Sequence, residues 1–293
     1  MSPLSAWIAA IRPKTLGLSL SPVLAGSALA FADTGSFRPL PFLAALAAAL
    51  LIQVGTNLHN DVADFRRGTD GEDRLGPPRA TARGWLAPAA VERGAWLAFF
   101  LAFLAGIYLA WVGGWPIVVL GLASLAAGAA YSGGPRPLSS LPVGELFVLL
   151  FFGLAAVGGS YYLQSGTLHG RALLAGLVLG LPAAAVLVVN NYRDREGDAR
   201  SGRRTLAVLL PPAGSRLEYG LLMLLPFAGL PLLLEPPWLL LPLLPLPFVV
   251  GLVREFRRSA PGPALNAVLA RTARMQLLLG LLLAAAFWLS RVL

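Results

Sequence analysis

Apolar stretches long enough to cross a bilayer recur along the whole chain, and they constrain its fold more than any other feature. A membrane-crossing helix needs about 20 predominantly apolar residues. Hydrophobic residues make up 57% of the 293 residues and charged residues 13%, whereas soluble domains carry roughly 25% charged residues. The mean hydropathy is +0.71. We therefore expect an all-α integral membrane protein, and a soluble helical core fits this composition poorly.

Hydropathy places about nine transmembrane helices. The first follows Arg12 and Lys14 and leads directly into further spans, which argues against a cleavable signal peptide. Glycines at 153, 158 and 159 interrupt the fifth. The expected spans are 15–32, 39–59, 94–112, 115–132, 143–163, 171–191, 217–234, 237–254 and 266–290.

Charge placement predicts the orientation of these spans. Cytoplasmic segments carry an excess of Lys and Arg. If the N-terminus is cytoplasmic, 20 of the 23 basic residues fall on that side, and only Arg38, Arg171 and Arg291 fall outside. The C-terminus would then lie outside, in the inner (cytoplasmic) membrane of a cell. The net charge of +9 is explained by topology and an anionic ligand, so no nucleic acid is expected. The absence of cysteine excludes disulfides and thiolate sites, and two histidines do not favour zinc.

Two acidic clusters share one spacing. The first contains Asn60, Asp61, Asp64 and Asp70, and the second reads Asn190-Asn191-Tyr-Arg-Asp194-x-x-x-Asp198. Of the fourteen Asp and Glu residues, eight fall within 61–73 and 194–198. Carboxylates at a membrane boundary are costly unless a cation, a proton or water compensates them. These clusters, interleaved with arginine, predict Mg²⁺ ions that hold a polyphosphate.

The shared spacing also predicts an internal repeat. Asn60 and Asn190 are 130 positions apart, and so are Asp64 and Asp194. Four expected spans lie between the clusters, so both face the cytoplasm. We expect one domain over 1–293, with halves at about 12–135 and 140–256 and a ninth helix at about 266–290. The two four-helix halves would face each other across a central cavity.

Each cluster would place its ligands on one helix face, because residues four apart in a helix align. Both clusters follow the C-terminal ends of apolar spans, where the helix dipole disfavours negative charge. A divalent cation would relieve this conflict, and Mg²⁺ readily combines one or two carboxylates with phosphate oxygens. Asn57, three residues before Asn60, is expected on the same face. The alternative is that these acids are solvated and paired with nearby arginines.

Several stretches resemble the UbiA-type intramembrane aromatic prenyltransferases along essentially the full chain. The matching stretches are Arg12-Pro-Lys14-Thr-Leu, Asn60-Asp61-x-x-Asp64, Gly76-Pro-x-Arg79-Ala, Tyr131-Ser-Gly-Gly-Pro, Gly144-Glu145-Leu-Phe, Tyr161-Tyr162-x-Gln164 and Asn190-Asn191-x-Arg193-Asp194. The 131–164 block is similar to the naphthoate branch. Two positions depart from the usual family pattern: Gly68 stands where many relatives have the last Asp, and Arg204 stands where a lysine is usual.

The resemblance implies transfer of a polyprenyl group from its diphosphate to 1,4-dihydroxy-2-naphthoate, with loss of CO₂ and diphosphate, to give demethylmenaquinol. It implies that Asp64, Asp194, Asp198, Asn60 and Asp70 are catalytic. Two or more Mg²⁺ ions would be held with the diphosphate by Asn60, Asp61, Asp64, Asp70, Asn190, Asp194 and Asp198. The implied substrate-binding residues are Lys14, Asn57, Arg79, Tyr131, Arg136, Tyr161, Gln164, Asn190, Arg193 and Arg204.

Alternatives remain at this point. The acceptor could instead be 4-hydroxybenzoate, homogentisate, haem or a chlorophyllide. A cation-coupled transporter is a remote alternative. Transporters place ionisable groups near the midplane of the membrane, whereas here these groups are expected at the cytoplasmic ends of the spans. Tyr131 and Tyr161 could shield a carbocation or anchor span ends at the interface, and Gln164 could contact the acceptor or a neighbouring helix. The sequence carries no pattern for tail length or oligomeric state.

Overall fold

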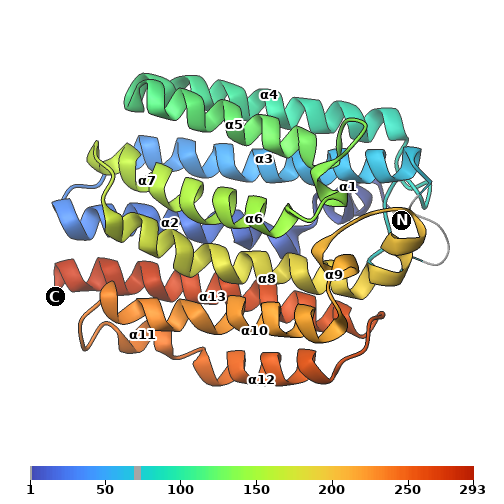
Figure 1. Cartoon of the computed structure of the whole chain (residues 1–293). Coiled ribbons are helices and arrows are strands. Elements are labelled where there is room, and N and C mark those ends of the chain that lie inside the picture. Colours follow the sequence, from blue (N-terminus) through green and yellow to red (C-terminus); the bar gives the residue numbers. More distant parts are fainter. Residues whose placement is uncertain (1, 69–73) are drawn as a thin grey trace.

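The protein is a bundle of long helices that run side by side (Figure 1). The computed structural model describes residues 2–68 and 74–293, and all regular secondary structure in these ranges is helical. The short α1 and α9 lie at one end of the bundle and the C-terminus lies at the other. The helices are α1 (Pro3–Ile11), α2 (Pro13–Thr34), α3 (Pro39–Arg66), α4 (Pro88–Gly113), α5 (Trp115–Ser132), α6 (Gly144–Val148), α7 (Ala156–Ser165), α8 (Gly170–Arg200), α9 (Leu206–Leu209), α10 (Pro212–Gly229), α11 (Leu240–Leu243), α12 (Leu246–Arg258) and α13 (Leu265–Val292), with the 3₁₀ turns η1 (Leu138–Ser140) and η3 (Leu230–Leu232) and the π-helical segment η2 (Leu149–Ala155).

The expectation of a multi-pass all-α membrane protein is confirmed. Within the described residues, seven helical segments are long and apolar enough to cross a membrane, and each coincides with an expected span. The segment expected at 143–163 is continuous from Gly144 to Ser165 despite its glycines. The remaining two expected spans, 217–234 and 237–254, contain α10, η3, α11 and α12. Prolines remove backbone donors and interrupt helices here, so the count of nine stays a prediction.

Proline also marks where the long helices begin. α2, α3, α4 and α10 each start at a proline, where the missing N–H would have had no partner inside the helix. α2 ends at Gly35, which has φ +71° and donates its N–H to the carbonyl of Phe31. A glycine in the left-handed region is the common way to end a helix.

α3 and α8 extend beyond their apolar spans. α3 was expected to end near 59 but continues to Arg66, and α8 was expected to end near 191 but continues to Arg200. Asn60, Asp61 and Asp64 of the first cluster and all of the second therefore lie on helical turns that project past the apolar region. This extension places Asn60 and Asp64 on one helix face, and Asn190, Asp194 and Asp198 on another.

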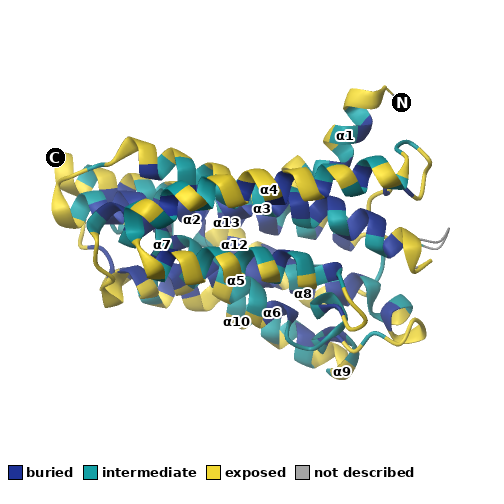
Figure 2. Cartoon of the chain, turned by 90° about the horizontal axis from the view of Figure 1, so that it is seen from above, coloured by how far each residue is buried: buried dark blue, intermediate teal, exposed yellow. Residues whose placement is uncertain are grey.

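The core is centred on α8, which packs against α10, α13, α7 and the π-helical segment η2. Apolar residues of these helices form the main buried cluster, while exposed residues lie on outer faces of α4, α5 and α10 (Figure 2). The contact between η2 and α8 is unusually close. A Cβ on Gly153 would lie 2.5 Å from the carbonyl oxygen of Gly176 and 2.8 Å from the Cα of Gly180. Only glycine fits there.

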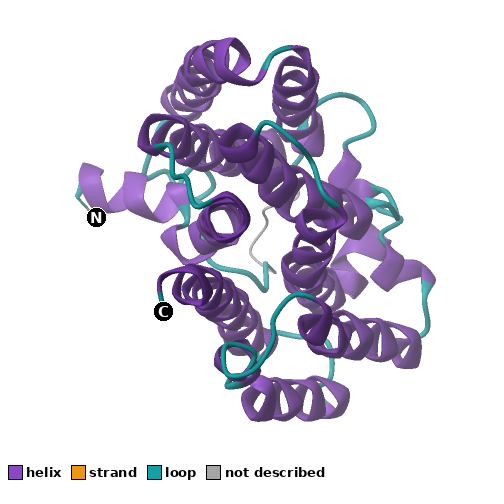
Figure 3. Ribbon diagram, turned by 90° about the vertical axis from the view of Figure 1, so that its left-hand side faces the viewer, coloured by secondary structure: helices purple, strands orange, loops and turns teal. Residues whose placement is uncertain are grey.

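Viewed along their axes, the helices surround a central region (Figure 3). A cavity of about 1170 Å³ opens there, lined by residues of α2, α3, α4, α5, η2, α7, α8 and α13. Its lining extends from Asp64 and Asp198, near the α1 end of the bundle, to Leu109, Ile117 and Leu163. The fold thus joins a charged mouth to a deep, largely apolar interior.

Candidate active site

Carboxylates from the two acidic clusters meet at the mouth of the cavity. Arg203, in the loop after α8, contacts Asp64 Oδ1 at 3.0 Å and Asp198 Oδ1 at 3.4 Å. The other oxygen of Asp64 accepts a hydrogen bond from Arg79 at 3.0 Å. One guanidinium thus touches a carboxylate from each cluster, although the two lie on α3 and α8.

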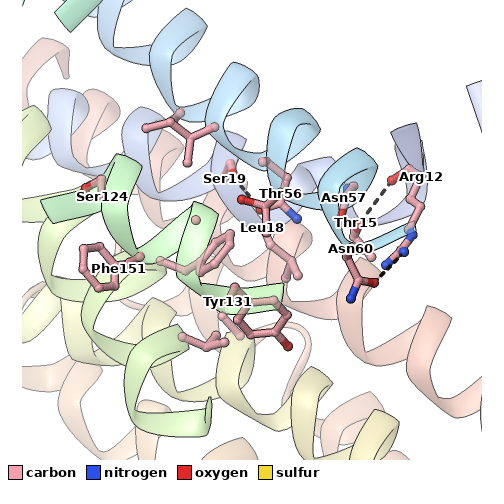
Figure 4. Close-up of a pocket in the computed structure, with 18 of the residues that line it drawn as sticks. Arg12, Thr15, Leu18, Ser19, Thr56, Asn57, Asn60, Ser124, Tyr131 and Phe151 are labelled. Carbon is pink, nitrogen blue, oxygen red and sulfur yellow. Dashed lines mark hydrogen bonds between the residues drawn. The ribbon is translucent and has the colours of Figure 1, made fainter. Parts of the chain in front are cut away.

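Asn60 is the centre of the first cluster. Its Oδ1 accepts hydrogen bonds from Arg12, at 2.9 Å, and from Arg79. Its Nδ2 donates to Asp64, at 3.1 Å, and to the hydroxyl of Ser132 at the end of α5, at 2.8 Å. Figure 4 shows Arg12 turned toward Asn60. The amide thereby fixes two cations and one carboxylate relative to one another.

Arg12 reaches this position because the chain turns sharply between α1 and α2. It is the one non-glycine residue with positive φ, +57°, in the described part of the chain. Hydrogen bonds support the turn on both sides: Asn57 Nδ2 donates to the Ile11 carbonyl at 2.8 Å, and Thr15 Oγ1 donates to the Arg12 carbonyl at 3.0 Å. Burial lowers the pKa of the Arg12 guanidinium, which opposes the raising effect of the nearby Asp61 carboxylate.

Arg193 organises the second cluster. Its side chain is 2% exposed and donates to both carboxylate oxygens of Asp194, at 2.8 and 2.5 Å. It also donates to Asn190 Oδ1 at 2.9 Å and to Asn266 Oδ1, on α13, at 2.7 Å. A buried arginine keeps its charge and binds carboxylates in a planar, two-pronged geometry. The second cluster is therefore held from α13 as well as from α8.

The donor set fits Mg²⁺. Asp64 and Asp198 contact a single cationic group, Arg203, so both can reach one cation. Residues 2–68 and 74–293 contain no group of three or more His, Cys, Asp or Glu side chains able to hold a metal by themselves. Mg²⁺ commonly takes one or two carboxylates and completes its shell with waters and phosphate oxygens. Asp64 and Asp198 are the pair that could hold one such ion, and the metal-ligand roles expected of Asn60, Asn190 and Asp194 stay predictions.

The carboxylate of Asp61 is held by the segment that follows Arg79. One carboxylate oxygen accepts the backbone N–H of Ala80 at 3.1 Å, and the other accepts the N–H of Thr81 at 3.1 Å together with its hydroxyl. The residue is 1% exposed. Both oxygens are thus occupied in fixing the segment that follows Arg79. The metal-ligand role expected for Asp61 stays a prediction, and Asp70 lies outside the described residues.

The other predicted site residues fall into two groups, those that line the cavity and those that do not. Lys14, Asn57 and Tyr131 line the cavity together with the residues described above. Arg136 and Arg204 are exposed and lie outside the cavity lining. The substrate contacts expected of these two arginines stay predictions.

Tyr161 and Gln164 also lie away from the mouth. The Tyr161 hydroxyl donates to Asp33 at 2.8 Å, and Gln164 bonds both backbone groups of Arg38. In the structure they tie α7 to the end of α2 and to Arg38, which precedes α3, and their expected substrate contacts stay predictions. The physical reason for their position is direction, because the fifth span starts at the mouth and ends at the opposite side.

Sequence reasoning missed four groups at the site. Arg203 faces the cavity where Arg204 was expected, Arg12 bonds Asn60, and Asn266 supports Arg193 from α13. Asn191 donates to the buried Glu145 at 2.8 Å and also lines the cavity. The Arg12 signal was present in its motif, whereas no pattern near 266 marks that asparagine.

These features define a class: a multi-pass helical membrane protein with paired arginines and carboxylates at the mouth of a largely apolar cavity. Solved structures share the fold. A UbiA homologue from Archaeoglobus fulgidus bound to GPP and Mg²⁺ matches with a TM-score of 0.67 at 14% identity, over 98% of this chain and 100% of that one. An apo UbiA homologue from Aeropyrum pernix K1 matches with a TM-score of 0.68 at 14% identity, over 94% and 98%.

Sequence comparison narrows the class. The model of the UbiA prenyltransferase family matches residues 19–268. The 1,4-dihydroxy-2-naphthoate octaprenyltransferase of Escherichia coli K12 is 35% identical, over 99% of this chain and 97% of that protein. The enzyme of the same name from Mycobacterium tuberculosis is 34% identical over 98% of both. Human UbiA prenyltransferase domain-containing protein 1 is 32% identical over 94% of this chain and 81% of that protein. The chain belongs to the UbiA prenyltransferase family and is a membrane prenyltransferase.

Proposed function

We propose that this enzyme transfers a polyprenyl group from its diphosphate to 1,4-dihydroxy-2-naphthoate, with Mg²⁺, to give demethylmenaquinol, CO₂ and diphosphate. The observation that carries the proposal is the meeting of Asp64 and Asp198 at Arg203, above an apolar cavity of about 1170 Å³. A polyprenyl diphosphate has the same polarity, with a highly charged head and a long apolar tail.

The choice of acceptor is supported by the relatives. Two bacterial proteins of 34–35% identity over nearly the whole chain carry the name 1,4-dihydroxy-2-naphthoate octaprenyltransferase. The metal is supported by the donor set and by a structural neighbour solved with GPP and Mg²⁺. We infer two or more ions, since Asp64 and Asp194 belong to separate clusters with separate arginine partners.

Asp64, Asp194 and Asp198 would hold the head group through Mg²⁺, and the bound ion would stabilise negative charge on the leaving oxygen. Arg79, Arg193 and Arg203 already lie among these carboxylates. Each can turn a guanidinium toward the phosphates, where two parallel N–H groups match phosphate geometry. Preorganised cations at the point where charge develops supply the main part of such catalysis. The allylic C–O bond then breaks, and its electron pair leaves with the diphosphate.

The acceptor ring supplies the electrons for the new bond. The ring carbon that carries the carboxylate attacks the allylic cation, and the C–C bond to the carboxylate then breaks. Its electron pair returns to the ring as CO₂ leaves, so charge and atoms balance without a further reactant. Tyr131, Phe147 and Phe151 line the cavity, and aromatic faces stabilise a cation that is shielded from water.

The same proposal places the mouth in the cytoplasm. It is supported by the excess of basic residues on that side and by the position of α1 and the C-terminus at opposite ends of the bundle. We further propose two homologous halves within a single domain in the cell membrane, related by the 130-residue offset of the clusters.

Product mass spectrometry on enzyme purified in detergent tests the proposal. The reaction contains Mg²⁺, geranylgeranyl diphosphate and either 1,4-dihydroxy-2-naphthoate or 4-hydroxybenzoate. We expect a prenylated naphthol that has lost CO₂, and no product when EDTA is present. Product from 4-hydroxybenzoate alone would refute the proposed acceptor while keeping the prenyl transfer. Unchanged turnover in EDTA would refute the metal requirement.

A further inference from the structure

We propose that the acceptor's hydroxylated aromatic ring binds against a polar wall on α2 and α3, while the prenyl chain lies against α8. The polar wall consists of Ser19, Gln53, Thr56 and Asn57, and all four line the cavity. The inference rests on the proposed function, because it assigns the two substrates to opposite sides of the same site.

The first observation is an asymmetry between the two clusters. Counting back from Asn60 on α3 gives Asn57, Thr56 and Gln53. Counting back equally far from Asn190 on α8 gives Leu187, Val186 and Ala183, which also line the cavity. Below the paired carboxylates, one wall is therefore polar and the other apolar. A metal–diphosphate site alone requires no such difference.

The second observation concerns Gln53. It is 8% exposed, and its Oε1 accepts a hydrogen bond from Ser19 Oγ at 3.2 Å. Among the described residues, no group hydrogen-bonds its Nε2. Turning the amide over would only exchange the atom left without a partner. Gln53 lines the cavity, so its Nε2 is available to donate to a ligand there. A ligand oxygen in the cavity would satisfy it.

Asn57 completes the pair one turn closer to the mouth. Its Nδ2 is used by the Ile11 carbonyl, whereas its Oδ1 has no hydrogen-bond partner in the described part of the chain. Gln53 and Asn57 are four residues apart, which is about 6 Å along a helix. This spacing is comparable with that between two oxygens on opposite carbons of one aromatic ring. The wall can thus accept from one ring hydroxyl and donate to another.

The depth of the polar wall below the mouth also fits the position expected for the acceptor ring. Gln53 lies seven residues before Asn60, about 10 Å along the helix axis, so a ring between them lies directly below the diphosphate. Figure 4 shows Ser19, Thr56 and Asn57 on the blue helices, with Tyr131 and Phe151 on green segments. Phe147 and Phe151 stack with ring centroids 6.0 Å apart. An isoprenoid chain is stabilised more by contact with these rings and with α8 than by contact with the polar wall, because burial of apolar surface contributes about 25 cal/mol per Å².

The test compares binding of two probes without metal or diphosphate: 1,4-dihydroxy-2-naphthoate and 2-naphthoate, which lacks both hydroxyls. Naphthoate fluorescence reports the Kd. We expect the wild-type protein to bind the dihydroxy acid about five- to tenfold more tightly, as for one or two net hydrogen bonds. Gln53→Met preserves side-chain shape and should abolish this preference. Its KM for geranylgeranyl diphosphate should stay within twofold.

Ser124→Ala is the matched control. Ser124 also lines the cavity, but its hydroxyl already donates to the Leu120 carbonyl at 2.8 Å, so the preference should remain. An unchanged preference in Gln53→Met, or a change confined to the KM of the prenyl diphosphate, would overturn the inference. If Gln53→Met does not fold, as judged by gel filtration, Ser19→Ala decides: a reduced preference supports the wall and an unchanged one overturns it.

Failure of the proposed function gives a different result. Wild-type protein that prenylates 4-hydroxybenzoate but no naphthoate would refute the naphthoate assignment. The same comparison would then use 4-hydroxybenzoate and benzoate. A hydroxyl preference that Gln53→Met removes would still support the polar wall, and one that it leaves intact would overturn it.

Discussion

Asp61 offers the sharpest separation between a metal ligand and a positioning residue. Its carboxylate accepts three hydrogen bonds from Ala80 and Thr81, directly after Arg79. Arg79 in turn bonds Asn60 and Asp64. The structure therefore predicts that Asp61 acts through Arg79, by holding the segment that carries it.

Asp61→Asn tests this prediction. The substitution removes the negative charge and replaces one acceptor oxygen with a donor that faces an N–H group. Hydrogen bonds to a charged acceptor contribute about 1.5–3 kcal/mol each, so the loss of one oxygen weakens docking of the segment by about 3 kcal/mol. Loss of one well-placed cationic or N–H donor typically lowers kcat by about 100-fold or more. We expect kcat to fall between about 10- and 100-fold, since part of the population stays docked.

The assay measures initial rates against Mg²⁺ concentration, together with trypsin cleavage at the exposed Arg83. For Asp61→Asn we expect the Mg²⁺ concentration at half-maximal rate to stay within twofold and cleavage to become faster. Asp64→Asn should instead raise the Mg²⁺ requirement at least about tenfold and leave cleavage slow. Thr81→Val removes the hydroxyl alone and should resemble a milder Asp61→Asn. A higher Mg²⁺ requirement with unchanged cleavage in Asp61→Asn would refute the reasoning.

Three further changes test the packing and the cation assignments. Gly153→Ala should lower the Tm in detergent by several degrees, because its Cβ would meet backbone atoms of α8 at 2.5 and 2.8 Å; Gly251→Ala, with open space around it, should not. Tyr161→Phe should cost about 1 kcal/mol of stability and leave both KM values within twofold, whereas a raised acceptor KM would support the expected substrate contact. Arg203→Gln should lower kcat/KM for the prenyl diphosphate about 100-fold, and the exposed Arg204→Gln should change it less than threefold; the reverse order would contradict the assignment.

Hydropathy was sufficient to predict the class of fold, because seven apolar segments have the length that a bilayer demands. It failed at the ends of α3 and α8, since polarity ends an apolar span without ending a helix. Asp61 and Asp64 continue the helix because their side chains find partners in the loop after α3. Those partners are about 15 to 20 residues away in sequence, beyond the reach of a local pattern.

The site was predictable where spacing carried the information. The repeated Asn-x-x-x-Asp pattern identified Asn60, Asp64, Asn190 and Asp194, which all line one cavity. It could not choose between Arg203 and Arg204, because the turn at Gly202, with φ +76°, decides which neighbour faces inward. The expected topology already put Gln164, at the end of the fifth span, opposite the mouth, where it bonds the backbone of Arg38.

The arginines explain how the carboxylates tolerate their position. An unpaired buried charge is strongly destabilising, whereas a paired one is tolerated. Asp64 on α3 is paired with Arg79 from the loop after α3 and with Arg203 from the loop after α8, and Arg203 also reaches Asp198. Asp64 is therefore neutralised partly by an arginine that follows α8. Asp64 is fully paired only when the loop after α8, 139 positions further along the chain, reaches the end of α3.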